Sequence, residues 1–217
     1  MALVFFDLDE TLIAGDSDYE WGNYLVSIGK VDGDVYESEN ARFYHDYRVG
    51  NLDVYEFLDF ALQPLAKYSY EELCAWREDY IQHCIKPIIK SQALELVEQH
   101  RKADDYLAIV TSTNQFITEP IKELFDIETL IATEPAMEGG RFTGTVAGTP
   151  CFGPGKVTRV KEWLASTNHS LVGSYCYSDS QNDIPLLELV DNPITVDADE
   201  KLSAYAMQKG WEQLQLK

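Results

Sequence analysis

The sequence predicts an α/β protein in which a parallel sheet, covered by helices on both faces, is interrupted by an inserted helical segment. An apolar run at residues 2–6 has the length and composition of a buried strand. Short apolar runs alternate with helical patterns over residues 88–210, which is the order expected of a parallel sheet. Between residues 16 and 86, aromatic and aliphatic residues recur at helical spacing with no strand pattern among them. We therefore expect an α/β core of residues 1–14 and 88–217 and a helical cap of residues 15–87.

The individual elements follow from apolar periodicity and from the glycines and prolines between them. The expected core helices cover residues 91–103, 116–125, 156–165, 183–190 and 201–209. The remaining strands cover residues 107–110, 130–132, 174–177 and 193–196, and residues 139–146 alternate like a hairpin. In the insert, apolar stripes at 21–28, 55–62 and 73–81 predict several helices, and aromatic stripes of this kind are typical of a core.

Charge and composition exclude several classes of function. The formal net charge is −20, from 17 basic and 37 acidic residues, which argues against a nucleic-acid partner because Lys and Arg contacts to phosphates dominate that affinity. No apolar run approaches the ~20 residues of a membrane span, and no basic stretch followed by an apolar segment opens the chain. We therefore expect no membrane partner and a cytoplasmic location. The four cysteines are scattered, as reduced thiols in a cytosolic protein are.

The most informative stretch is residues 5–12, Phe-Phe-Asp-Leu-Asp-Glu-Thr-Leu, where the first strand ends in two carboxylates. Side chains alternate along a strand, so Asp7 and Asp9 point into the same space while Leu8 points into the core. Two neighbouring carboxylates repel each other unless a cation lies between them. The pair indicates a metal-assisted reaction centre, and the alternative is that one carboxylate only caps a turn.

Three further polar groups follow a strand or begin a helix, and they are Thr111–Asn114, Lys156 and Asp179…Asp183. Ligands of open parallel sheets bind beyond the carboxyl ends of the strands, so these groups are expected to meet Asp7 and Asp9 there. Taken singly, they could be helix caps, a solvated lysine and an acidic turn. Together they supply what phosphoryl transfer requires: a carboxylate nucleophile, oxygen ligands for Mg²⁺, donors to phosphoryl oxygens and a neutralising lysine.

With these four segments the chain resembles the haloacid dehalogenase (HAD) superfamily, in the branch whose helical cap follows the first motif. That branch includes phosphoserine phosphatase and HAD-type histidinol-phosphate phosphatases. The matching motifs are Asp7-Leu8-Asp9-Glu10-Thr11, Thr111 after Ala108-Ile109-Val110, Lys156, and Asp179-Ser180-Gln181-Asn182-Asp183. The resemblance extends over essentially the whole chain, with the cap as its least specific part. It implies a Rossmann-like sheet and a Mg²⁺-dependent phosphatase that works through an aspartyl-phosphate.

The resemblance also implies roles for the matching residues. Asp7 would attack phosphorus, and Asp9 would protonate the leaving oxygen and then activate water. Asp7, the backbone carbonyl of Asp9, and Asp179 would bind Mg²⁺. The remaining matches would hold the phosphoryl group (Thr111, Ser112, Lys156 and Asn182) or support the metal and the lysine (Asp183 and Thr11). Dehalogenases of the superfamily lack the second acid and need no Mg²⁺, so the intact pair favours a phosphatase.

The motifs depart from those of phosphoserine phosphatases at two places. Those enzymes usually have two glycines where this chain has Ser112 and Thr113, and a glycine where it has Ser178. The resemblance therefore identifies the superfamily and leaves the substrate open.

The cap is expected to supply the residues that select the substrate. Asp16, Asp18, Trp21 and Arg48 are the candidates for its inner face. For Trp21, the favoured alternative is a position in the core of the cap. Asp16 is the nearest match to a family glutamate that meets a substrate amine, and Arg48 or Arg42 could meet a carboxylate. The net charge and the early-cap acids favour a small phosphomonoester that carries a positive amine, such as phosphoserine or histidinol phosphate.

Alternative functions stay open. The same scaffold could serve a phosphotransferase, or a phosphonatase with Lys30 or Lys67 as its cap lysine, although neither has a suitable setting. A non-enzymatic alternative is a catalytically silent module that binds a phosphate ligand, against which the complete motifs argue. Apart from the small-molecule substrate, we expect a monomer or a weak homodimer.

Overall fold

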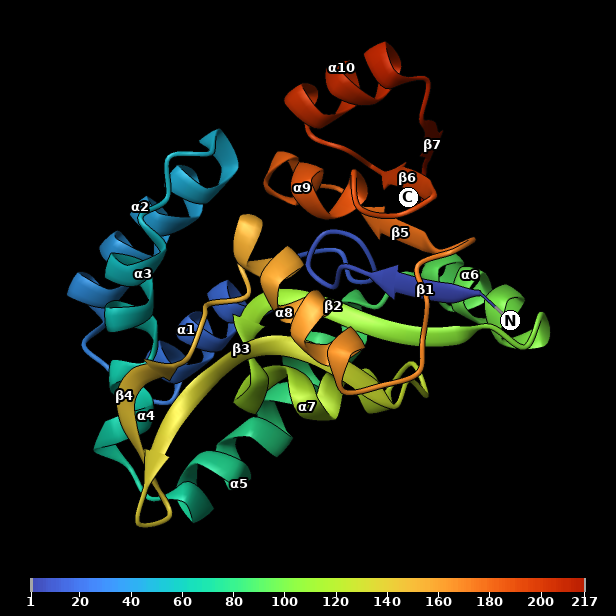
Figure 1. Ribbon diagram of the computed structural model, residues 1–217. Helices are drawn as coiled ribbons and strands as arrows, with labels where there is room; N and C mark the ends of the chain where they lie inside the picture. The colour runs from blue at the N-terminus through green and yellow to red at the C-terminus, as the bar shows by residue number, and fades with distance from the viewer. Residues whose placement is uncertain (1, 217) are drawn as a thin grey trace.

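A seven-stranded sheet forms the centre of the protein, as a computed structural model of residues 2–216 shows (Figure 1). Residues 1 and 217, the outer limits of the expected core, lie outside the described residues. The strand order is β4-β3-β2-β1-β5-β6-β7, and every neighbouring pair is parallel except β3–β4. The strands are β1 (Leu3–Phe6), β2 (Tyr106–Asn114), β3 (Thr129–Glu138), β4 (Arg141–Ala147), β5 (Tyr175–Ser178), β6 (Asn192–Val196) and β7 (Glu212–Leu214).

The first strand is central and buried on both sides because its residues alternate between two apolar clusters. Val4 and Phe6 belong to the cluster on one face of the sheet, and Leu3 and Phe5 belong to the cluster on the other. A strand that is buried on both faces reads as a continuous apolar run, which is why residues 2–6 were recognisable. The central position of β1 places the residues that follow it at the middle of the carboxyl edge of the sheet.

Helices of the core cover both faces. Residues of α6 (Ser91–Lys102) and α7 (Gln115–Glu123) join the cluster of Val4 and Phe6. Residues of α8 (Pro154–Ala165), α9 (Ile184–Leu187) and α10 (Glu200–Lys209) join the opposite cluster. The predicted α/β fold is confirmed, with helices on both faces of a mostly parallel sheet.

The segment between β1 and α6 is helical, as predicted. It consists of α1 (Ser17–Ser27), α2 (Gly33–Val49), α3 (Val54–Ala61), α4 (Gln63–Lys67), α5 (Tyr70–Tyr80), the π-helix η1 (Ile81–Ile85) and the 3₁₀ turn η2 (Lys86–Ile88). Three of these helices match the apolar stripes, whereas α2 was not recognised as an individual element. The bounds of 15–87 for the cap stay a prediction.

Trp21 belongs to the core of the protein. Its side chain is fully buried, and its ring packs against Tyr24, Tyr80 and Phe116. Because Phe116 is on α7, this contact joins the helical segment to the α/β part. One continuous apolar cluster contains residues of both parts, so the sheet and the cap share a core.

A hairpin also reaches from the sheet to the cap. β4, the strand at one edge of the sheet, lies beside α3 and α4 (Figure 1). Phe142 of β4 packs between Tyr70 of the cap and Phe116 of α7, with ring centroids 5.8 and 5.2 Å away. The cap is therefore attached along one side by apolar contacts.

Several element boundaries differ from the prediction. β2 continues through the polar residues Thr111–Asn114, with a shift of register against β3 after Val110. The expected hairpin exists, but its first strand is the continuation of β3, and its turn is at Gly139–Gly140. The expected helix at 183–190 is a 3₁₀ turn, η3 (Gln181–Asp183), followed by the short α9. Strand β7 was not predicted, because Glu212–Leu214 is an exposed edge with no apolar pattern.

No helix among residues 2–216 has the length and apolarity needed to cross a bilayer. The cytoplasmic location stays a prediction.

The shared core leads to a prediction about stability. Leu65 of α4 is fully buried in the cluster that joins cap and sheet. We expect Leu65→Ala to lower the free energy of unfolding by about 2–5 kcal/mol, because a cavity replaces packed methyl groups. Urea unfolding followed by tryptophan fluorescence and by circular dichroism should give one coincident transition. The control Leu94→Ala, at an exposed position, should change the free energy of unfolding by no more than about 0.5 kcal/mol. Separate transitions for the two probes would contradict a shared core.

Candidate active site

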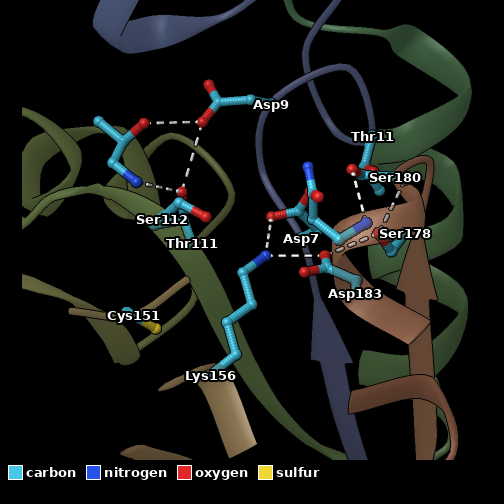
Figure 2. A network of polar contacts seen from close by, with 12 residues as sticks. Asp7, Asp9, Thr11, Thr111, Ser112, Cys151, Lys156, Ser178, Ser180 and Asp183 are labelled. Atoms are coloured by element: carbon cyan, nitrogen blue, oxygen red, sulfur yellow. Dashed lines mark hydrogen bonds and ion pairs between the residues drawn. The ribbon is translucent and has the colours of Figure 1, made fainter. Parts of the chain in front are cut away.

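Polar side chains meet where β1, β2 and β5 end at the carboxyl edge of the sheet. Figure 2 shows them around Lys156, with Asp7 and Asp9 from the loop after β1 and Thr111 from β2. The loop after β5 supplies Asp179 and Asp183. Strand order changes direction at β1, and a crevice of this kind is where open α/β sheets bind ligands. The structure thus brings together the four segments that the sequence singled out.

Lys156 bridges two buried carboxylates. Its Nζ lies 2.9 Å from Oδ1 of Asp7 and 2.7 Å from Oδ2 of Asp183, and all three side chains are almost completely buried (Figure 2). Burial alone would lower the pKa of Lys156, but Asp183 and Asp7 raise it well above its usual value, so the ammonium stays charged. Burial is also the largest effect on Asp7 and raises its pKa to about 7, against the opposing effect of Lys156.

The position of Lys156 depends on a close approach of the backbone. Lys156 lies in the first turn of α8, directly after Gly155. A Cβ at position 155 would lie 2.1 Å from the carbonyl oxygen of Pro150, so only glycine fits there. The Gly-rich loop before this helix therefore brings the lysine under the carboxylates.

Asp9 is held by groups from two directions. Its Oδ1 accepts a hydrogen bond from the backbone N–H of Ser17 at 2.6 Å. Its Oδ2 accepts from the hydroxyls of Thr113 at 2.9 Å and Thr111 at 3.4 Å. Burial, the largest effect, raises the pKa of Asp9 although these hydrogen bonds oppose the shift. A carboxyl group with a raised pKa that lines the pocket can serve as an acid and then as a base.

The loop after β5 is fixed by hydroxyl groups. Thr11 donates to Oδ1 of Asp179 and accepts from its backbone N–H, both at 3.1 Å. Ser178 donates to Oδ2 of Asp183 at 2.7 Å. Burial, followed by the charges of Asp7 and Asp183, raises the pKa of Asp179 well above its usual value. Carboxylates crowded in this way are stabilised by a bound cation.

Mg²⁺ fits these residues. Oδ2 of Asp7 is buried and has no hydrogen-bond partner among the described residues, which leaves a charged acceptor for a cation. Mg²⁺ is usually held by one or two carboxylates together with waters and substrate phosphate. Within residues 2–216 no group of three His, Cys, Asp or Glu side chains forms a metal-binding cluster. Asp7 and Asp179 are the carboxylates that fit this requirement, and the complete ligand set with the backbone carbonyl of Asp9 stays a prediction from the resemblance.

A pocket that is partly open to solvent lies between these carboxylates and the cap. Its acidic lining residues are Asp7, Asp9, Asp16 and Asp18, and no Lys or Arg lines it among the described residues. Its aromatic lining residues are Tyr19, Phe43, Tyr44, Tyr47, Phe57 and Phe152. Acids and aromatic rings together form a favourable environment for an organic cation.

The two early acids of the cap have different positions. Asp16 caps α1, and its Oδ1 accepts from the backbone N–H groups of Asp18 and Tyr19 at 2.9 and 2.8 Å. Asp18 Oδ1 accepts from the amide of Asn114 at 3.3 Å. Both acids line the pocket, as predicted for the inner face of the cap. The carboxylate of Asp16 is held by backbone N–H groups, whereas the hydrogen bond to Asp18 comes from a side chain.

The two arginines suggested for the cap lie outside this pocket. Arg48 lines a neighbouring pocket and donates to the hydroxyl of Tyr44 at 3.4 Å. Arg42 is half-exposed and pairs with Glu39 and Glu56. Neither is placed to meet a carboxylate group in the acidic and aromatic pocket. Lys30 and Lys67 line neither of these two pockets.

The predicted phosphate-binding residues are only partly directed toward the site. Ser112 and Thr113 line the pocket. The Thr111 hydroxyl accepts from the backbone N–H of Thr113 at 3.2 Å in addition to its contact with Asp9. The Nδ2 of Asn182 donates to the backbone carbonyl of Tyr47 at 3.3 Å, so this amide contacts the cap. The functional roles of these residues stay predictions.

Sequence reasoning did not single out the residues of α2 that face the site. Phe43, Tyr44 and Tyr47 line the pocket, together with Asn40 one turn earlier. Their spacing of three and four residues is the helical pattern that could have identified this face. It was missed because polar residues surround them and because aromatic residues in the insert were assigned to its core.

Known proteins resemble this chain over its full length. A family model described as haloacid dehalogenase-like hydrolase matches residues 4–188. The histidinol-phosphatase of Neisseria meningitidis serogroup C (strain 8013) is 43% identical over 219 residues, which cover 99% of each chain. The crystal structure of a protein of unknown function from Bordetella pertussis Tohama I has a TM-score of 0.94 at 40% identity, over 100% of this chain and 99% of that one. A phosphoserine phosphatase in a phospho-aspartyl intermediate analogue has a TM-score of 0.72 at 18% identity, over 100% and 93%, which shows the same fold.

The environment of Asp18 predicts a pH-dependent stability. Burial first, and then the charge of Asp9, raises the pKa of Asp18 to about 7. Between these two pKa values the folded protein keeps the proton of Asp18, whereas the unfolded chain, with the ordinary pKa of 3.8, releases it. The contribution of Asp18 to the free energy of unfolding therefore falls as the pH rises from about 4 to 7 and does not change at higher pH. We expect Asp18→Asn to stabilise the metal-free protein more at pH 8 than at pH 5, by on the order of 1 kcal/mol.

Urea unfolding at the two pH values measures this difference. Asp59→Asn, at an exposed position of α3, is the control and should show the same small effect at both. An Asp18→Asn effect that is independent of pH would contradict the raised pKa.

Proposed function

The chain belongs to the haloacid dehalogenase-like hydrolase family, and on that premise we propose that it hydrolyses a small, amine-bearing phosphomonoester with Mg²⁺, through an aspartyl-phosphate at Asp7. The predicted enzyme class, a phosphatase, agrees with this family and with its histidinol-phosphatase relative. The observation that carries the proposal is the buried bridge of Lys156. It fixes one oxygen of Asp7 and leaves the other without a partner among the described residues, at the edge of a pocket.

The proposed reaction has two steps. In the first, a carboxylate oxygen of Asp7 bonds to phosphorus while the bond from phosphorus to the substrate oxygen breaks, and Asp9 gives its proton to that oxygen. In the second, Asp9 takes a proton from water as the water oxygen bonds to phosphorus, and the bond to Asp7 breaks. Inorganic phosphate leaves, and Asp9 is protonated again for the next cycle.

The remaining residues of the site would bind and neutralise the phosphoryl group. Lys156 offers a permanent positive charge beside Asp7, and Ser112 and Thr111 offer hydroxyl and backbone groups at the end of β2. Mg²⁺, when bound by Asp7, Asp179 and the carbonyl of Asp9, would supply further charge neutralisation. Asp183 would keep the ammonium group in place through its 2.7 Å contact.

The pocket supports a substrate with a positive group and no carboxylate. Asp16 and Asp18 would attract an ammonium or imidazolium group, and the aromatic rings would pack against its body. A substrate carboxylate would meet acids and no cation there, since Arg48 and Arg42 lie outside. Of the two substrates suggested by the sequence, histidinol phosphate therefore fits this pocket better than phosphoserine, and a histidinol-phosphatase is among the relatives.

The proposed chemistry predicts how activity depends on Asp7 and on the metal. The protein with Mg²⁺ should release phosphate from p-nitrophenyl phosphate, and removal of divalent cations with a chelator should abolish the release. Asp7→Asn should lower kcat by at least roughly a thousandfold, because the amide cannot form the covalent intermediate. Phosphate release measures both effects.

Asp59→Asn is the matched control, because it makes the same chemical change at an exposed position away from the site. Retained activity in Asp7→Asn would exclude the proposed nucleophile. No activity of the unchanged protein toward a broad panel of phosphomonoesters would favour the phosphate-binding module, and phosphate transfer to an added alcohol in preference to water would favour the phosphotransferase.

The charge of the pocket predicts the order of substrates. We expect kcat/KM for histidinol phosphate to exceed that for phosphoserine, and that for sugar phosphates and phosphoglycerate, by roughly tenfold or more. Steady-state phosphate release over this panel measures the order. Faster turnover of sugar phosphates or phosphoglycerate would exclude an amine-bearing substrate while leaving the phosphatase chemistry intact.

A further inference from the structure

Tyr47 is one of three residues of the cap, with Asp16 and Tyr44, that line both pockets around the carboxylates. It lies near the end of α2 and lines the pocket that contains Asp7 and Asp9. It also lines the neighbouring pocket that contains Asp9 and Asp179. Tyr47 therefore borders the region in which the phosphoryl group is proposed to react.

The end of α2 is fixed by three hydrogen bonds, two from the turn η3 after β5 and one from α10. The carbonyl oxygens of residues 47, 48 and 49 accept from Asn182 at 3.3 Å, Gln181 at 3.2 Å and Lys201 at 2.8 Å. The last carbonyl groups of a helix have no partners within the helix, so donors from the core satisfy them here. Gly50 follows in a left-handed conformation with φ of +78°, and a Cβ there would lie within 3.1 Å of Gln181, which allows the close approach.

The aromatic ring of Tyr47 is also held. It packs against Phe152, which lies in the loop before Lys156, with ring centroids 6.1 Å apart. The residue is thus fixed by its backbone on one side of the site and by its ring on the other.

The hydroxyl of Tyr47 has no hydrogen-bond partner in the part of the chain that the structure describes. Two buried tyrosines of the cap differ in this respect: Tyr80 donates to the carbonyl of Ser17 at 2.6 Å, and Tyr24 donates to Asp79 at 2.9 Å. Burial first, and then the charges of Asp179, Asp7 and Asp183, raises the pKa of Tyr47 well above its usual value. The hydroxyl therefore keeps its proton and can donate a hydrogen bond.

We propose that Tyr47 is a catalytic residue whose hydroxyl donates a hydrogen bond to the phosphoryl group as it is transferred to and from Asp7. This inference rests on the proposed phosphatase function. A phosphoryl group over Asp7 brings several oxygen atoms that need donors, and Lys156 and the end of β2 are candidate donors from the core. A neutral donor from the cap completes the set on the opposite side. Asn182 then acts as a positioning residue, because it holds the backbone of Tyr47.

Tyr47→Phe tests the proposal, because it removes one oxygen atom and keeps the ring. With p-nitrophenyl phosphate and Mg²⁺, we expect kcat to fall roughly tenfold to hundredfold, with KM within about threefold of its original value. Binding of orthovanadate, which imitates the phosphoryl group in transfer, should weaken about tenfold or more in a calorimetric titration with Mg²⁺.

Tyr36→Phe is the matched control. Tyr36 is on the same helix, is buried, and lines neither pocket. Its loss of a hydroxyl should leave kcat and vanadate affinity within about twofold. An equal loss in both variants would overturn the proposal, as would a Tyr47→Phe protein with unchanged kcat and unchanged vanadate affinity.

The vanadate titration separates this inference from the proposed function. If the unchanged protein hydrolyses no phosphomonoester, the proposed function fails, and the relative vanadate affinities of the unchanged protein and Tyr47→Phe still decide the role of the hydroxyl. A Tyr47→Phe effect confined to KM would assign Tyr47 to substrate binding and would overturn its catalytic role.

Discussion

One buried lysine holds together the acidic groups on which this site depends. Lys156 lies within 2.9 Å of Asp7 and 2.7 Å of Asp183 in a region from which solvent is almost excluded. Without a cation, carboxylates from β1 and from the loop after β5 could not share that space while ionised, because their desolvation and mutual repulsion are unfavourable. The position of this lysine also depends on the backbone, because α8 can bring Lys156 to the carboxylates only if residue 155 has no Cβ.

The lysine neutralises only part of the acidic charge. Asp7 keeps one unsatisfied oxygen, and Asp9 and Asp179 add further carboxyl groups with raised pKa values. The remaining negative charge is what a divalent cation on one side and a cationic substrate on the other would balance. The same electrostatic imbalance therefore accounts for both the proposed metal and the proposed substrate class.

The cap is attached by two kinds of contact, and they lie at different ends. Trp21 and Phe142 join it to the sheet through apolar packing with Phe116, and this packing is part of the shared core. The end of α2 is attached by hydrogen bonds from Asn182, Gln181 and Lys201 to backbone carbonyl groups. Water can replace such hydrogen bonds at little net cost in free energy, whereas exposing the shared core is unfavourable. The end that carries Tyr47 is thus the less firmly attached part of the cap.

The sequence alone determined the fold class and the superfamily, and it predicted which side chains of the core lie together in the candidate site. Buried strands of a parallel sheet are continuous apolar runs, and the polar residues at their carboxyl ends must meet at one edge, so Asp7, Lys156 and Asp183 were predictable from local patterns. Only the tertiary structure decided which cap residues face that edge. The pattern of α2 is weak, with Tyr36, Asn40 and Phe43 as its buried residues, and it does not say which side packs on the core. Asp18 and Tyr47 came to line the pocket beside Asp7, and Arg48 came to line only the neighbouring pocket, because helix packing and the docking of α2 fix their orientation. Such contacts join residues far apart in the chain, and no periodicity in one sequence encodes them.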